Sequence, residues 1–250
     1  MSTPQTAPSA HFEIRYLING ELALRLRDYV REYLDFEEWC VGQPDFSAPV
    51  ETLYLDSPDL RLFWDTVARP DNHLQLRVRR LHGAHNGPVT LEIKRRCVEG
   101  VRKEKALLTL PGMETLLGGE LPEHDPLLRN SSGAMFTIEH FWELMQKFNA
   151  RPCLRVTYAR EGYVNDDGTI AVNFDRGVSA ESRAKPLLKR PLASHWRMPR
   201  GQVVLELKFR DRFPEWFREM TETFDLSPTD VCKYRAGLDG LGANPGAPRE

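Results

Sequence analysis

Four short segments of the chain repeat the pattern apolar, charged, apolar, charged, and this alternation constrains the fold more than any other feature. The segments are FEIR (12–15), LRVR (76–79), LEIK (91–94) and LELK (205–208). Successive side chains of a β-strand point to opposite faces, so both charged residues of a segment lie on one face. Two interpretations stay open: the charged face meets water, as in an ordinary antiparallel sheet, or it lines the polar interior of a barrel.

Length and composition favour one large domain. The chain has 250 residues, of which 41% are hydrophobic and 28% are charged, which is enough to bury a full core. Residues 1–10 and 242–250 are rich in small residues and proline and are expected to be disordered, leaving 11–241 as a single domain. No apolar run reaches the ~18 residues of a membrane-spanning helix. The first residues also lack the basic and apolar parts of a secretory signal.

Cysteine and histidine spacing argues against a zinc site and against a disulfide scaffold. The cysteines are widely separated and form no CxxC pair, and the histidines show no HExxH-type spacing. Either kind of site would need such spacing. Lone thiols are typical of a reducing compartment, so we expect a cytoplasmic protein.

Basic residues cluster locally, although the net charge is only −2. No acid lies between Glu181 and Glu206. The basic residues of that segment are Arg183, Lys185, Lys189, Arg190, Arg197 and Arg200. The segment is either a solvated loop or a collar at the mouth of an anion site. Nucleic acid is not expected as a partner, because the basic strands lack interleaved exposed aromatic residues that would stack on bases.

The remaining pattern predicts about eight strands interrupted by helices. Strands are expected at 12–18, 52–55, 74–80, 89–96, 101–109, 153–163, 169–174 and 203–209. Helices are expected at 21–36, 58–67, 137–148, 213–224 and 229–241, and 111–133 is expected to be a loop with one helical turn. Asn19 and Ser57 are expected to cap the first two helices. This order favours an α+β fold, an eight-stranded antiparallel β-barrel with helices packed outside.

The motifs also occur in a characteristic order: EIRY, YLDSPDLRLFWD, LRVRR, LEIKRR followed by Lys103, TYAREGY, NFD, LELKF and CKYRAG. In this order they resemble the VTC polyphosphate polymerase domain, a branch of the triphosphate tunnel metalloenzyme (CYTH-like) superfamily, from about Glu13 to Gly240. The resemblance implies a tunnel barrel whose inward basic side chains bind a triphosphate unit. It also implies a divalent cation, Mn²⁺ or Mg²⁺, held by inward acids, and an enzyme that uses ATP to lengthen inorganic polyphosphate.

Individual roles follow from this resemblance. The expected catalytic residues are Arg77, Arg79, Lys94, Arg160 and Lys233. Further phosphate-binding residues are expected at Arg15, Lys103, Lys208 and Arg183, and metal ligands at Glu206, Glu13 and Glu92. Two positions depart from the family pattern, because Arg15 stands where lysine is usual and Ala171 where arginine is usual. Ala171 removes one phosphate ligand unless Arg176 or Arg183 reaches the same space.

The physical reason for such a site is electrostatic. Two like charges about 6 Å apart at an effective dielectric near 20 repel by roughly 3 kcal/mol, so a tunnel lined by basic groups is unfavourable until an anion neutralises it. Phosphoryl transfer needs positioning and positive charge more than it needs a covalent nucleophile.

Alternatives remain at the level of both function and site. The chain is a phosphotransferase that makes polyphosphate from ATP, a hydrolase of tripolyphosphate or of a nucleoside triphosphate, or a polyphosphate-binding module without catalysis. The pairs Glu92 with Lys94 and Glu206 with Lys208 are alternatively salt bridges on a wet face. The sequence leaves open the preferred metal, the oligomeric state and any membrane-protein partner.

Overall fold

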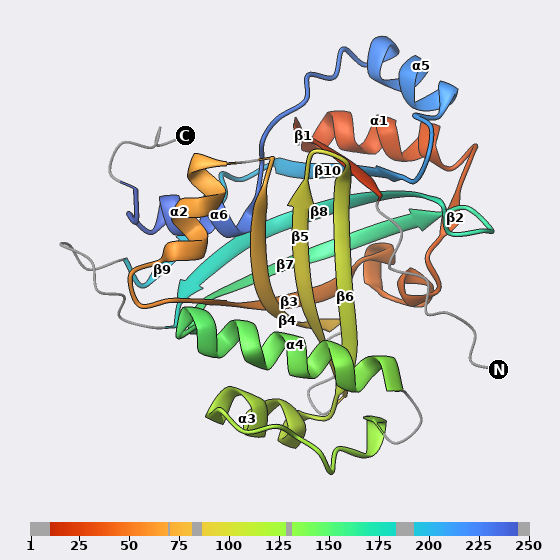
Figure 1. The fold of residues 1–250 in the computed structure, drawn as a ribbon. Coiled ribbons are helices and arrows are strands. Elements are labelled where there is room, and N and C mark those ends of the chain that lie inside the picture. Colours follow the sequence, from red (N-terminus) through yellow and green to blue (C-terminus); the bar gives the residue numbers. More distant parts are fainter. Residues whose placement is uncertain (1–10, 70, 82–86, 129–131, 184–192, 245–250) are drawn as a thin grey trace.

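The centre of the molecule is a curled antiparallel sheet (Figure 1). The computed structural model describes residues 11–69, 71–81, 87–128, 132–183 and 193–244. Eight strands follow one another in the order β1-β10-β8-β7-β3-β4-β5-β6. They are β1 (Phe12–Asn19), β3 (Ala48–Asp56), β4 (His73–Leu81), β5 (Val89–Cys97), β6 (Gly100–Leu108), β7 (Arg151–Val164), β8 (Ile170–Ser182) and β10 (Gln202–Phe209). The short strands β2 (Asp35–Phe36) and β9 (His195–Arg197) pair with β7 and β8 off this path.

The sheet closes on itself at one end, where its edge strands β1 and β6 meet. The backbone N–H of His11 donates to the carbonyl of Val101 at 3.0 Å, and the N–H of Val101 donates back at 2.7 Å. Neighbouring strands along the path are antiparallel. The predicted fold class is therefore confirmed, and the curled sheet has a concave face that is separate from its helix-covered side.

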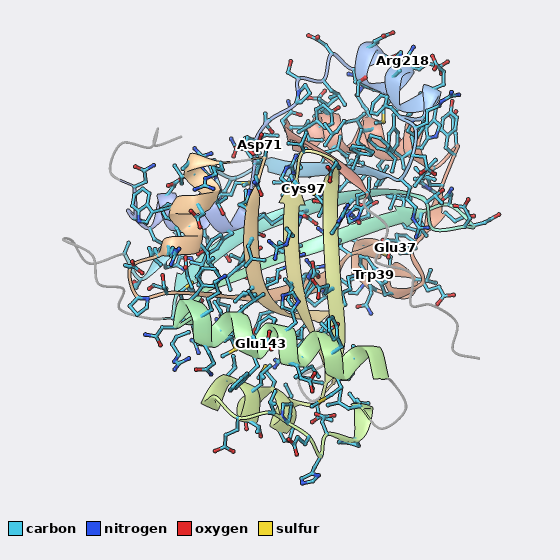
Figure 2. The ribbon with its side chains drawn as sticks, viewed as in Figure 1. Glu37, Trp39, Asp71, Cys97, Glu143 and Arg218 are labelled. Carbon is cyan, nitrogen blue, oxygen red and sulfur yellow. The ribbon has the colours of Figure 1, made fainter. Side chains whose placement is uncertain are left out.

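Helices cover the sheet in three groups (Figure 1). They are α1 (Gly20–Val30), α2 (Arg61–Ala68), α3 (Leu110–Gly118), α4 (Ser132–Phe148), α5 (Glu215–Thr223) and α6 (Lys233–Gly240). One apolar cluster joins α3 and α4 to β4, β5 and β6, a second joins α1 and α5 to β1, β8 and β10, and a third joins α2 and α6 to β3, β7 and β8. Polar side chains face outward, as Glu143 on α4 and Arg218 on α5 illustrate (Figure 2). No helix in the described part of the chain is long and apolar enough to cross a membrane.

Two predicted helix boundaries are wrong near the start of the chain. The first helix ends at Val30 instead of residue 36, because the chain turns at 31–33 and then forms β2. The second begins at Arg61 instead of residue 58, because Leu60 adopts a left-handed backbone with φ of 58°. Asp56 caps that helix in addition to the predicted Ser57, since its carboxylate accepts from the backbone N–H groups of the first turn.

Later boundaries also need correction. The predicted loop at 111–133 contains α3, which begins where the hydroxyl of Thr109 accepts from the N–H of Gly112 at 3.1 Å. The last helix begins at Lys233 instead of residue 229. The hairpin turn at 82–86, and residues 184–192 of the basic segment, lie outside the described residues.

Candidate functional site

Register places the charged residues of neighbouring strands side by side on the concave face. Arg77 on β4 pairs with Glu92 on β5, and Lys94 on β5 pairs with Lys103 on β6. On the opposite half of the sheet, Arg15 on β1 pairs with Glu206 on β10, and Glu13 on β1 pairs with Lys208 on β10. The alternation seen in the sequence therefore builds an interior charged face and not only a wet surface.

These side chains surround a cavity of about 530 Å³, its opening to solvent included. The lining residues are Glu13, Arg15, Tyr54, His73, Gln75, Arg77, Arg79, Lys94, Arg96, Lys103, Tyr158, Arg160, Glu206, Lys208, Cys232 and Lys233. Ten of the twelve predicted site residues are thus brought together.

Glu92 and Arg183 are the two predicted residues outside this lining. Glu92 is 1% exposed and is bound by Arg77, which places its carboxylate behind the cavity wall. Arg183 follows the end of β8, its backbone N–H donates to the carbonyl of Cys153 at 2.8 Å, and its side chain is exposed. The expected help of Arg183 at the cavity is not supported by this placement.

Positive charge is in excess. The lining holds nine Arg and Lys side chains and two carboxylates, Glu13 and Glu206. Glu92 and Asp175 add two acids behind Arg77 and Arg160, so nine against four leaves an excess of five. Of the nine basic residues, Arg77, Lys94 and Arg160 are buried and the others are partly buried. An excess of positive charge in such a partly enclosed cavity favours the binding of an anion.

Glu13 is the centre of the first ion-pair network. Its carboxylate contacts Arg15 at 2.5 Å, Lys94 at 2.6 Å, Lys103 at 2.7 Å and His11 at 2.9 Å. Burial raises the pKa of this carboxyl, but the nearby lysines outweigh that effect and hold the pKa well below 4.5. Glu13 is therefore ionised and ties three strands together.

Asp175 is the centre of the second network, and sequence reasoning gave it no role. Its carboxylate accepts two hydrogen bonds from Arg160, at 2.6 and 2.8 Å, and contacts Lys233 at 2.5 Å. Burial lowers the pKa of Lys233, but the attraction of Asp175 is stronger and the pKa is raised. The signal was available, because Asp175 ends the motif NFD and shares strand parity with Ala171.

Other lining residues were missed for a similar reason. Arg96 extends the alternation of β5 by one step, and Gln75 and His73 extend that of β4 by one and two steps. Tyr158 lies under two cations, with Arg160 5.3 Å and the Lys233 nitrogen 4.9 Å from its ring centre. Extending each charged alternation to the end of its strand would have found the first three.

Several buried polar groups of this face have no hydrogen-bond partner. The Nε atoms of Arg77 and Arg79 are among them, as are both amide atoms of Asn173. Within the described residues, the side chain of Arg79 makes neither an ion pair nor a hydrogen bond. Asn173 is 0% exposed and lies opposite Glu206 in the sheet. Unpaired buried donors are costly, but the Nε atoms of Arg27, Arg80 and Arg155, outside the cavity lining, also have no hydrogen-bond partner in the described part of the chain. It is therefore the clustering of basic groups around the cavity that indicates an anion site.

Burial also acts on the lysines of the cavity. Desolvation lowers the pKa of Lys94 well below 10.5, although Glu13 opposes the change. The pKa values of Lys103 and Lys208 are lowered for the same first reason. A bound anion would place negative charge beside these amines and so favour their protonated forms.

Helix α6 delivers Lys233 to the cavity and is anchored by the next residue. The hydroxyl of Tyr234 donates to Asp56, whose carboxylate also accepts from the N–H groups of Ser57, Leu62 and Phe63. Burial is the main reason that the pKa of Asp56 is raised. Asp56 thus joins the starts of α2 and α6 and holds Lys233 in place through the helix.

Ala171 shares a face of the sheet with part of the cavity lining. It lies opposite Lys208 on β10 and Val164 on β7. Since Lys208 lines the cavity, a longer side chain at position 171 would extend along the same face. Ala171 does not itself line the cavity, and the gap that it is expected to leave in the phosphate-binding ring stays a prediction.

The residues do not fit a resident divalent metal in this arrangement. Glu13 and Glu206 are occupied by basic side chains, and so is Glu92. The described residues contain no group of three or more His, Cys, Asp or Glu side chains able to hold a metal ion. The roles of these glutamates as metal ligands stay a prediction.

Comparison with known proteins gives one family and several distant structures. The family profile described as "VTC domain" matches residues 10–241. No curated protein sequence matches the chain. Among solved structures, a putative adenylate cyclase from Bacillus halodurans has a TM-score of 0.48 at 15% identity, covering 90% of this chain and 94% of that one. A conserved hypothetical protein from Pyrococcus furiosus has a TM-score of 0.44 at 12% identity, covering 89% and 97%. The PH1819 protein of Pyrococcus horikoshii has a TM-score of 0.38 at 16% identity, covering 93% and 90%.

Proposed function

The chain belongs to the VTC domain family, and on that premise we propose that its concave cavity binds a triphosphate unit and transfers the γ-phosphate of ATP to a growing polyphosphate chain. The observation that carries this proposal is the excess of buried positive charge, together with the unpaired guanidinium donors of Arg77 and Arg79. Phosphate oxygens are acceptors that match such donors in charge and geometry.

The proposed roles of the side chains follow from their contacts. Arg77 and Arg79 bind phosphate oxygens through their free Nε–H groups. Arg160 and Lys233, oriented by Asp175, stabilise the charge that develops on the transferred group. The terminal oxygen of the acceptor phosphate attacks directly, so the mechanism needs no covalent nucleophile from the protein.

The family implies use of a divalent cation, and Mn²⁺ or Mg²⁺ is the expected ion. Because the candidate carboxylates are occupied by basic groups, no step is assigned to that ion here. The cation is included in the ATP assay as the metal complex of the nucleotide.

Thermal unfolding with tripolyphosphate tests the binding half of the proposal. A ligand at a hundred times its dissociation constant adds about 2.7 kcal/mol, which for a domain of this size raises the melting temperature by roughly 5–10 °C. The absence of a shift at low salt would contradict the binding site.

Incubation with ATP and Mn²⁺, followed by gel separation, tests the transfer half. Long polyphosphate supports the polymerase, whereas free phosphate alone supports a hydrolase. Ala171 favours one further candidate, a binding module without catalysis, because it removes a phosphate ligand from the face that Lys208 lines. Binding without either product would support that module.

A further inference from the structure

Arg15 lies between two of the glutamates that were predicted as metal ligands. Its Nη2 donates to Glu13 Oε2 at 2.5 Å, and its Nε donates to Glu206 Oε1 at 3.0 Å. The Arg15 side chain is 11% exposed, and the two acids are 0% and 7% exposed. One buried guanidinium therefore joins two carboxylates that come from different strands.

The remaining oxygens of these carboxylates are also engaged. Glu13 Oε1 accepts from Lys103 at 2.7 Å. Glu206 Oε2 lies 3.4 Å from Arg160 and 3.5 Å from Lys208. A divalent cation needs such oxygens as direct ligands at about 2.0–2.6 Å, and a guanidinium held between them would repel it.

We propose that Arg15 is a built-in counter-cation that stands in place of a divalent metal between Glu13 and Glu206, so that the cavity binds triphosphate without a resident metal ion. This inference rests on the triphosphate binding proposed above. It adds that Arg15, and not a metal ion, supplies the positive charge between the two glutamates. Arginine suits the position because its planar fork donates in two directions and keeps its proton. The lysine that the family usually has at this position ends in a single ammonium group.

Two binding measurements on the full chain test the role of Arg15. Free Mn²⁺ is followed by electron paramagnetic resonance, and tripolyphosphate binding by calorimetry, first in EDTA and then with Mn²⁺. The wild-type protein is expected to bind tripolyphosphate at least as tightly in EDTA as with Mn²⁺, and to take up no stoichiometric Mn²⁺ when the anion is absent.

The variant Arg15→Gln is expected to behave in the opposite way. Its tripolyphosphate affinity in EDTA falls by about tenfold or more, because one charge-assisted contact is lost. The protein then takes up Mn²⁺ between the two uncovered carboxylates, and Mn²⁺ restores the affinity. Adding Glu206→Gln to this variant removes the Mn²⁺ uptake.

Controls separate charge from folding. Arg15→Lys keeps the positive charge but loses the fork, so it is expected to bind tripolyphosphate in EDTA more tightly than Arg15→Gln and more weakly than the wild-type protein. Arg218→Gln, which changes an exposed arginine on α5 (Figure 2), is expected to match the wild-type protein in both measurements. Circular dichroism checks that each variant is folded, and the wild-type measurements do not depend on any variant.

The outcomes distinguish the two claims. Wild-type binding that requires Mn²⁺ would overturn the role of Arg15 and leave the proposed function standing. No tripolyphosphate binding under either condition would overturn the proposed function, and with it this inference. Folded Arg15→Gln without Mn²⁺ uptake would show that Arg15 does not occupy the place of a metal.

Discussion

Two buried aspartates, Asp56 and Asp175, contact the first two residues of α6, Tyr234 and Lys233 respectively. The two carboxylates differ in the kind of donor that surrounds them. Asp56 accepts hydrogen bonds from neutral donors, namely backbone N–H groups and the hydroxyl of Tyr234. The carboxylate of Asp175 instead contacts the charged side chains of Arg160 and Lys233. Lys233 lines the cavity, whereas its neighbour in sequence, Tyr234, fixes the helix to Asp56.

The comparison distinguishes a buried carboxylate that stabilises the fold from a buried carboxylate that orients the side chains of a binding site. A carboxylate that is surrounded by neutral donors is complete without any further partner. A carboxylate that lies among several cations neutralises only part of their charge, so the cavity keeps a net positive charge that an anion can bind. Asp56 therefore belongs to the architecture, and Asp175 to the proposed triphosphate site.

The largest expected effect comes from removing each aspartate in turn. Both Asp56→Ala and Asp175→Ala should lower the free energy of unfolding by about 3–5 kcal/mol, since each leaves buried groups without a partner. Tripolyphosphate should recover most of the loss in Asp175→Ala only, because the anion replaces the carboxylate there. Urea unfolding with and without tripolyphosphate measures this, and equal recovery in both variants would break the comparison.

A smaller effect on stability and a large one on binding are expected at Arg79. Because this side chain has no ion pair within the described residues, Arg79→Gln should leave stability nearly unchanged. The loss of a charge-assisted contact of roughly 1.5–3 kcal/mol should weaken tripolyphosphate binding by about one to two orders of magnitude. Calorimetry measures the affinity.

Arg80→Gln is the matched control for that experiment. Arg80 is adjacent in sequence, lies outside the cavity lining and points to the other face of β4. We expect its affinity to equal that of the wild-type protein. Similar losses in both variants would mean that binding depends on general surface charge and not on the concave face.

Ala171→Arg tests whether the ring of basic side chains is open at this point. A new arginine beside Lys208 should strengthen tripolyphosphate binding by about one order of magnitude. Ala171→Gln supplies length without charge and should leave affinity unchanged, as should Arg183→Ala, whose side chain is exposed. If Arg183→Ala weakened binding, Arg183 would contribute to the site despite its exposed position, and if Ala171→Arg left affinity unchanged, the position assigned to this gap would be wrong.

The smallest expected effect concerns pH. The pKa values of Glu13 and Glu206 are held well below 4.5 in the folded state, so their contribution to stability is full above 4.5 and is lost as pH falls through the lower folded values. The pKa of Asp56 is raised above 3.8, mainly by burial, and this group instead becomes less costly on acidification. The two changes oppose each other, which limits the net effect.

Urea unfolding at a series of acidic pH values measures this balance. Glu206→Gln should flatten the acid-side decline, because one of the lowered carboxyl groups is gone. An unchanged pH profile in that variant would show that Glu206 does not have a strongly lowered pKa.

By itself the sequence determined which residues of one strand share a face. The alternation in β4, β5 and β10 follows from the two-residue period of a strand and places Arg77 with Arg79, Glu92 with Lys94 and Glu206 with Lys208. That these faces line one interior was expected only from the family resemblance. The alternation could not determine which charges meet, because that depends on register and curvature.

Only the tertiary structure decided which charged side chains form ion pairs. Lys94 reaches Glu13 across 81 residues of sequence, and Arg15 reaches Glu206 across 191. The curl of the sheet brings these strands around one cavity, and it turns Asp175 into a partner of Lys233, while Arg183 remains outside. Local pattern fixes the direction of a side chain, but closure of the sheet fixes its neighbours, and the neighbours decide whether a charge is a surface feature or part of a site.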